Sequence, residues 1–206
     1  MIPTHPKLLL HSFPQKIPVD KVKVVIVGQD PYPDESGMAS GIAFGCPKND
    51  IKPSLQYIIQ DLAKSYKLTV GETKEKLDTT LESWKEQGVI LWNANLTCEV
   101  RRPGSHTNIW HDFTAGFLNC LSNYNFDLVE YKPMVFVLMG KLAQSFEPYI
   151  NKGHIVLKTP HPAIAAYSED RTFVGCDIFN KINISLEKTD QQPITWLEQY
   201  QIWESH

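Results

Sequence analysis

The stretch KVKVVIVGQDPYPDESGMASGIAFGCP, residues 21–47, joins an apolar run to a polar segment rich in proline and glycine. Its first part, residues 22–28, is rich in valine and isoleucine, which is typical of a buried strand. The apolar run ends on an amide, a carboxylate and a phenol, Gln29, Asp30 and Tyr32, set among prolines. A buried strand that gives way to polar side chains raises the question of what those side chains serve.

Three further apolar runs have the length of buried strands, at residues 89–92, 134–139 and 154–158. Segments with helical character lie between and after them, at residues 54–66, 77–87, 111–123, 141–150 and 176–187. Strands that alternate with helices predict an α/β fold, with a parallel sheet covered on both faces. In such sheets ligands bind beyond the carboxyl ends of the strands. The polar side chains that follow these strands are therefore candidates for a site.

Length and composition predict one globular domain over residues 1–206, with 42% hydrophobic and 21% charged residues. No run of 18 apolar residues occurs, so we expect no membrane-spanning segment. The first residues, MIPTHPKLLLHSFPQKIP, lack the basic-then-apolar order of a signal peptide. The four cysteines form no CxxC pair, which favours reduced thiols over a metal site. We expect a cytoplasmic monomer without a metal.

The formal net charge of −3 argues weakly against a protein that coats nucleic acid, although it leaves room for a local basic groove. Asp30 either caps a turn or presents a carboxylate that orients a water or stabilises a developing cation. Asn93 is either a turn amide or a reader of an amide-like base edge. His161 lies between two prolines. It is either a surface or core residue or an imidazole that the prolines fix in a pocket. Tyr32 and Phe44 are core residues or a stacking face for a base.

Seven blocks of this sequence, in order, resemble family 1 uracil-DNA glycosylase. They are GQDPY (28–32), PSL (53–55), WKEQGVILWNANLT (84–97), SH (105–106), VFVLMGKLAQ (135–144), HP (161–162) and FVGCDIFNKIN (173–183). The resemblance extends from about residue 2 to residue 196. It implies a three-layer α/β/α fold with a central four-stranded parallel sheet. It also implies an enzyme that removes uracil from single- and double-stranded DNA without a cofactor or metal.

The resemblance assigns a role to each pocket residue. Asp30 would position the attacking water and stabilise the oxocarbenium-like sugar, and His161 would hydrogen-bond uracil O2 as negative charge builds on the base. Asn93 would read uracil N3–H and O4. Tyr32 would exclude the 5-methyl group of thymine, Phe44 would stack on the flipped base, and the Gln29 backbone would line the pocket.

The resemblance also implies contacts to the DNA backbone and a partner class. The residues concerned are Pro53, Ser54, Ser105, His106, Gly140 and Lys141. Lysine stands at 141 where the family has serine, and would add a Coulombic phosphate contact. A proteinaceous inhibitor that mimics DNA is a further candidate partner, since the family is targeted by such inhibitors.

Several positions depart from the family pattern. Pro33 replaces a histidine, Ala163 replaces a phosphate-contacting serine, and the loop from His161 to Arg171 is about two residues longer. The identity of the wedge residue, which fills the space left by the flipped base, is therefore undecided, with Ile164 as first choice and Tyr167 as second.

Two other functions compete with an active glycosylase. The first is a non-enzymatic DNA-binding or processivity protein on the same fold, which the loss of the family histidine and serine favours. Retention of Asp30, Tyr32, Phe44, Asn93 and His161 opposes it. The second is a flavodoxin-like nucleotide or redox protein, which the lack of a phosphate-cradling glycine-rich loop after the first strand opposes.

Overall fold

A computed structural model of the chain describes residues 17–33, 39–124, 131–163 and 173–198. Four strands, Val24–Gly28 (β1), Val89–Asn93 (β2), Val135–Met139 (β3) and Ile155–Thr159 (β4), form one parallel sheet. The strand order is β2-β1-β3-β4, so β1 and β3 lie in the middle. The predicted four-stranded parallel sheet is confirmed.

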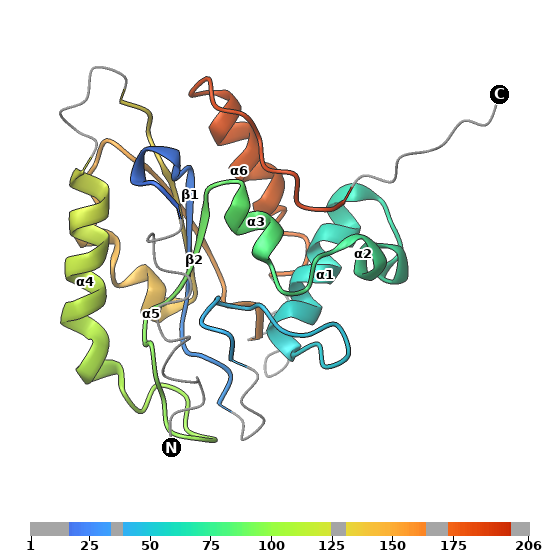
Figure 1. The fold of residues 1–206 in the computed structure, drawn as a ribbon, viewed down its shortest axis with the longest axis horizontal. Helices are drawn as coiled ribbons and strands as arrows, with labels where there is room; N and C mark the ends of the chain where they lie inside the picture. Colours follow the sequence, from blue (N-terminus) through green and yellow to red (C-terminus); the bar gives the residue numbers. More distant parts are fainter. Residues whose placement is uncertain (1–16, 34–38, 125–130, 164–172, 199–206) are drawn as a thin grey trace.

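The sheet separates two layers of helices (Figure 1). The helices are Pro53–Tyr66 (α1), Val70–Lys76 (α2), Glu82–Glu86 (α3), Thr107–Asn123 (α4), Lys141–Gln144 (α5) and Ile178–Glu187 (α6), with short 3-10 turns at Val19–Lys21 and Glu147–Tyr149. Helices α1, α3 and α6 cover one face, and α4 and α5 cover the other. None of these described helices combines the length and the apolar character that crossing a membrane requires.

Alternate residues of each strand supply the two halves of the core. On β1, Val24 and Ile26 point toward the α1 and α6 side, whereas Val25 and Val27 point toward α4. All four side chains are at most 1% exposed. This burial on both faces explains why the strands read as apolar runs rather than as an alternating pattern.

Several helix boundaries differ from the sequence prediction for local reasons. The predicted helix 77–87 is helical only over Glu82–Glu86, because the Asp78 carboxylate accepts hydrogen bonds from the backbone N–H groups of Thr80 and Ser83 and forms a turn. The predicted helix 141–150 stops after one turn at Gln144 and continues as a 3-10 turn that contains Pro148.

Helix α2 was not predicted, although its start carries a recognisable signal. The Thr69 hydroxyl accepts a hydrogen bond from the Glu72 backbone N–H, and the Glu72 carboxylate accepts one from the Thr69 backbone N–H. This reciprocal pair is a capping box, which the sequence pattern Thr-x-x-Glu announces.

Because all four strands are parallel, their carboxyl ends lie at the same edge of the sheet. Gly28 of β1 is in register with Asn93 of β2, and the Gly140 N–H donates to the Thr159 carbonyl at the end of β4. The connection that follows β1 runs to β2 on one side of the sheet, and the connection that follows β3 runs to β4 on the other side. The two connections diverge between β1 and β3, which opens a crevice at this edge.

Candidate active site

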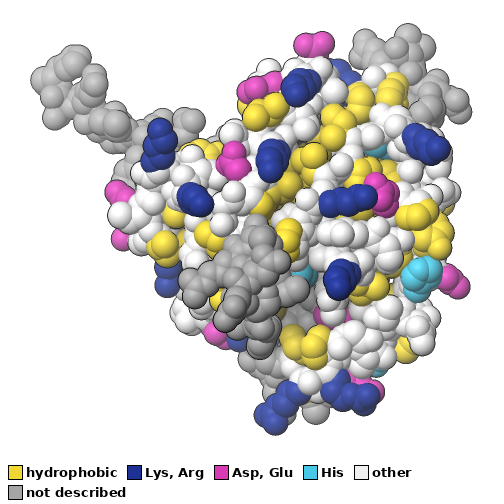
Figure 2. Space-filling view, turned by 180° about the vertical axis from the view of Figure 1, so that it is seen from behind, with side chains coloured by type: hydrophobic (Ala, Val, Ile, Leu, Met, Phe, Trp, Pro, Cys, Tyr) yellow, Lys and Arg dark blue, Asp and Glu magenta, His cyan; other side chains and the backbone are white. Residues whose placement is uncertain are grey.

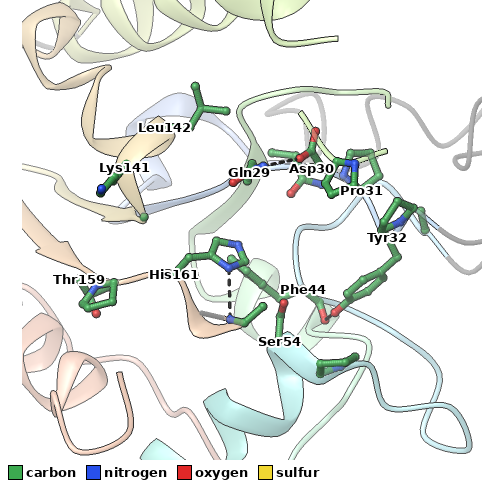
Figure 3. A pocket seen from close by; sticks show the side chains of 18 of the residues that line it. Gln29, Asp30, Pro31, Tyr32, Phe44, Ser54, Lys141, Leu142, Thr159 and His161 are labelled. Atoms are coloured by element: carbon green, nitrogen blue, oxygen red, sulfur yellow. Dashed lines mark hydrogen bonds between the residues drawn. The ribbon is translucent and has the colours of Figure 1, made fainter. Parts of the chain in front are cut away.

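A cavity of about 810 Å³ lies at the carboxyl edge of the sheet. Segments that follow β1, β2, β3 and β4, together with the start of α1, contribute its walls (Figure 3). Among the predicted site residues, it brings together Gln29, Asp30, Tyr32, Phe44, Pro53, Ser54, Asn93, Gly140, Lys141 and His161. Residues remote in the sequence thus share one space.

The Asp30 carboxylate is held by hydrogen bonds on both oxygens. Its Oδ2 accepts from the Gln29 side-chain amide at 2.8 Å and from the Gly104 backbone N–H at 2.9 Å. Its Oδ1 accepts from the Asn95 side-chain amide at 2.8 Å. Donors of this kind stabilise an ionised carboxylate and fix its direction. Asp30 is therefore more than a turn cap, since its partners come from two other segments.

His161 is a neutral imidazole with a defined tautomer. Burial lowers its pKa from 6.5 to about 4, so the ring carries no charge near neutral pH. The Ala163 backbone N–H donates to His161 Nδ1 at 3.2 Å, as the dashed line in Figure 3 shows. Because Nδ1 is the acceptor, the ring proton resides on Nε2. His161 therefore offers one N–H donor to a ligand.

Two glycines, Gly28 and Gly140, leave room for the side chains that line the cavity. A Cβ atom on Gly140 would come within 2.8 Å of the His161 Cβ, and Gly140 has a φ of 91°, which L side chains rarely adopt. A Cβ atom on Gly28 would come within 2.7 Å of the Phe44 ring and 3.3 Å of Asn93 Oδ1. Glycine at these strand ends lets His161, Phe44 and Asn93 approach the sheet.

The aromatic wall of the pocket is locked in place. Phe44 has a positive φ of 69°, which is uncommon for an aromatic residue, and its side chain is 7% exposed. The Tyr32 hydroxyl donates a hydrogen bond to the Phe44 carbonyl at 2.5 Å. The bond joins the segment after β1 to the Phe44 backbone, so the two rings keep a fixed relation.

Asn93 presents an amide to the pocket from the end of β2. Asn93 is 7% exposed and lines the cavity. An amide in this position can donate and accept on one edge.

The remaining predicted residues lie elsewhere. Ser105 and His106 immediately follow Gly104; the Ser105 hydroxyl accepts a hydrogen bond from the Glu99 N–H, and His106 Nδ1 lies 2.9 Å from Thr97 Oγ1. They do not line the cavity. Ile164 and Tyr167 lie outside the described residues. The roles predicted for all these residues stay predictions.

The sequence reasoning missed three residues that support Asp30 from behind the cavity, namely Asn95, Gly104 and Thr107. It also missed lining residues such as Leu142, Gln144 and Thr159. Asn95 is 1% exposed and joins Asp30 to Thr107. A polar residue two positions after Asn93, inside an otherwise apolar stretch, was the available signal. Among the described residues, no cluster of histidine, cysteine or carboxylate side chains could hold a metal ion.

The Uracil DNA glycosylase superfamily model matches residues 14–187. The chain is similar to a uracil-DNA glycosylase of Azobacteroides pseudotrichonymphae, with 38% identity over 184 residues, 88% of this chain and 77% of the relative. It is also similar to that of Dichelobacter nodosus, with 37% identity over 200 residues, 95% of this chain and 81% of the relative.

Solved structures agree in fold. The crystal structure of mimivirus uracil-DNA glycosylase superposes with a TM-score of 0.79 at 29% identity, covering 95% of this chain and 74% of the other. A variant of mimivirus UNG in complex with UGI superposes with a TM-score of 0.78 at 27% identity, covering 95% and 76% of the two chains. The three-layer fold with a parallel sheet is thus shared with solved proteins.

Proposed function

The chain belongs to the uracil DNA glycosylase superfamily, and from this membership we propose how its pocket works. The chain is a uracil-DNA glycosylase, a hydrolase that cleaves the N-glycosidic bond of deoxyuridine in DNA and acts in base excision repair. We assign it to family 1 of these enzymes. The observation that carries this assignment is that Asp30, Asn93, Phe44 and His161, from separate segments, line one cavity.

The substrate base must leave the DNA stack before it can react. A cavity of about 810 Å³ has room for a flipped pyrimidine and part of its sugar. Phe44 offers a stacking face for the base, and Tyr32 occupies the side on which thymine carries its methyl group. The hydrogen bond between the Tyr32 hydroxyl and the Phe44 carbonyl keeps this barrier rigid.

Recognition of uracil depends on the Asn93 amide. Its oxygen accepts from uracil N3–H and its NH₂ group donates to O4. Cytosine reverses the donor and acceptor at these positions, so it would leave buried polar groups unpaired. Asn93 ends β2 in register with Gly28, which leaves room for the Asn93 side chain.

Bond cleavage divides charge between the sugar and the base. The Asp30 carboxylate stabilises the positive charge that develops on the sugar and orients the water that attacks it. The His161 Nε2–H donates to uracil O2, where negative charge develops. A neutral imidazole suits this role, since it stabilises the uracil anion by a hydrogen bond without transferring a proton to it.

Contacts to the DNA backbone are proposed for Pro53, Ser54, Ser105, His106, Gly140 and Lys141. On the face shown in Figure 2, basic and acidic side chains are interspersed and the basic ones form no broad patch. Phosphate attraction would therefore come from a few lysines, among which Lys141 lines the cavity. Ile164 is proposed as the wedge that fills the vacated stack, with Tyr167 as the second choice.

Further properties complete the proposal. A mimivirus UNG variant has been solved in complex with UGI, and we propose that such a protein inhibitor also binds this chain where DNA does. We propose that residues 1–206 act as one domain, as a monomer in the cytoplasm. The two core clusters share one sheet, which supports a single domain.

Uracil release from single- and double-stranded uracil-containing oligonucleotides tests this function. The wild-type protein should release free uracil and leave abasic sites, whereas Asp30→Asn should bind the same DNA but react slower by orders of magnitude, because the carboxylate acts chiefly in the transition state. DNA binding without uracil release by the wild type would instead support the non-enzymatic alternative.

A further inference from the structure

Asp30 is supported by a closed ring of hydrogen bonds that reaches the start of α4. We infer that Asn95 is a positioning residue, which aims the Asp30 carboxylate at the attacking water with the help of Gly104 and Thr107. This inference rests on the proposed function, because it concerns the same carboxylate. Asn95 itself is buried and does not line the cavity, so it would act only through Asp30.

The orientation of the Asn95 amide is determined by its neighbours. Its Nδ2 donates to Asp30 Oδ1 at 2.8 Å and to Thr107 Oγ1 at 3.1 Å. The reversed amide would place Asn95 Oδ1 against the Asp30 carboxylate, oxygen against oxygen, which is repulsive. Both N–H groups of the amide therefore point toward the ring.

Thr107 and Gly104 close the ring. The Thr107 hydroxyl donates to the Gly104 carbonyl at 2.9 Å, and so it must accept from Asn95. The Gly104 N–H in turn donates to Asp30 Oδ2 at 2.9 Å. Thr107 thereby binds the carbonyl of Gly104, while the N–H of the same glycine binds Asp30. The two carboxylate oxygens are fixed from two segments that are tied to each other.

The ring leaves a definite acceptor site on Asp30. An ionised carboxylate has about four lone-pair sites. Among the described residues, Gln29 and Gly104 occupy two sites on Oδ2, and Asn95 occupies one site on Oδ1. The remaining site is on Oδ1, the oxygen that Asn95 holds. Asn95 thus decides in which direction Asp30 accepts a proton of the attacking water.

A purely structural role fits Asn95 poorly. Its Oδ1 is buried and has no hydrogen-bond partner among the described residues. A buried carbonyl without a partner lowers stability, whereas an apolar side chain of similar size would bear no such cost. An amide at this position is consistent with a need for its two donors beside Asp30.

The decisive experiment is a double-mutant cycle between Asn95 and Asp30. Single-turnover excision from a single-stranded uracil oligonucleotide gives the maximal rate and the half-saturating enzyme concentration. Asn95→Leu should lower the maximal rate about 10- to 100-fold, the equivalent of one hydrogen bond to a charged group, with the half-saturating concentration changed less than about threefold. In the Asp30→Asn background, the same substitution should lower the residual rate by less than about threefold.

Thr107 supplies variants that keep the inference testable if Asn95→Leu does not fold. Thr107→Val should also lower the maximal rate. Thr107→Ser, which keeps the hydroxyl, should react at close to the wild-type rate. Thr114→Val is the matched control: it removes a buried hydroxyl from the same helix, one that bonds to Trp92 and to the Ala94 carbonyl and not to Asp30. It should lower the melting temperature and leave the rate unchanged.

Three results would overturn the inference. The first is that Asn95→Leu lowers the maximal rate by the same factor with and without the Asp30 carboxylate. The second is that Asn95→Leu raises the half-saturating enzyme concentration and leaves the maximal rate unchanged. The third is that Asn95→Leu and Thr107→Val both fold and react at the wild-type rate. Each of these leaves the wild-type protein active. A wild-type protein that releases no uracil would refute the proposed function instead, so the two failures are distinguishable.

Discussion

The rings of Phe44 and His161 lie 5.9 Å apart, centroid to centroid, at an interplanar angle of 47°. A base sandwiched between two parallel rings would need a separation of about 7 Å, twice the contact distance of carbon atoms. The two rings therefore do not sandwich a base between them. A base stacked on Phe44 would meet His161 through a hydrogen bond, for which the His161 Nε2–H is the available donor.

The Asn93 amide sets the choice of base. Asn93→Asp replaces the NH₂ donor with an oxygen, so the variant should release less uracil and gain detectable release of cytosine. Parallel assays on oligonucleotides that carry one uracil or one cytosine measure the change. Intact uracil release without any cytosine release would take the discrimination away from Asn93.

Tyr32 combines two features that two variants separate. Tyr32→Ala should admit thymine because the ring that excludes the methyl group is gone. Tyr32→Phe keeps the ring and removes the hydroxyl that donates to the Phe44 carbonyl, so it should still exclude thymine. Thymine release is measured from a thymine-containing oligonucleotide. If Tyr32→Ala releases uracil well and no thymine, another group provides the exclusion.

Gly140→Ala tests the contact between Gly140 and His161. Its φ of 91° and ψ of 167° lie in a region that only glycine occupies readily, so alanine should cost about 1–3 kcal/mol of stability. The added Cβ would also displace His161 and lower the excision rate more than tenfold.

Gly116→Ala is the matched control for that substitution. Gly116 lies within α4, and a Cβ atom there meets nothing within 4 Å. Alanine should therefore add about 0.5–1 kcal/mol of stability without a change in rate. Urea unfolding and single-turnover rates measure both variants, and a normal rate for Gly140→Ala would contradict the packing argument.

His161 should make the protein less stable in mild acid. Its pKa is lowered from 6.5 to about 4 by burial, so between these values the unfolded chain binds a proton that the folded chain does not. The free energy of unfolding should therefore fall by up to about 3 kcal/mol as the pH falls through this window. Urea unfolding between pH 7 and pH 4 should show a shallower decline for His161→Gln than for the wild type. His111→Gln, which removes a partly exposed histidine from α4, controls for the loss of one imidazole.

The wedge can be identified from the ratio of duplex to single-strand rates. Filling the vacated stack matters only in a duplex, so Ile164→Ala should slow duplex excision much more than single-strand excision. Tyr167→Ala should show a smaller bias of the same kind. Equal losses on both substrates would make Ile164 a pocket support, and a larger duplex effect for Tyr167→Ala would transfer the role.

The sheet could be predicted from the sequence because each strand is a local apolar run that ends where polar residues or glycine begin. The same reasoning placed Asp30 and Asn93 at strand ends, where the structure has them in one cavity. The bond between Asp30 and Asn95 could not be predicted in this way, because it depends on how β1 and β2 align and not on either segment alone. The positive φ of Phe44 has no local signal either, since the Phe44 carbonyl is bound by Tyr32 and the Phe44 ring packs against Gly28, both of which lie in another segment.

The parallel arrangement of the strands also governs when activity can appear during synthesis. Asp30 leaves the ribosome early, its supports at Asn95 and Gly104 emerge later, and His161 follows only after β4. Parallel strands cannot be joined by a tight hairpin, and their pairing requires distant parts of the chain to meet. A nascent chain that stops before β4 therefore carries Asp30 and Asn93 without the imidazole. Uracil excision would begin only once the chain through β4 and His161 has been made and folded.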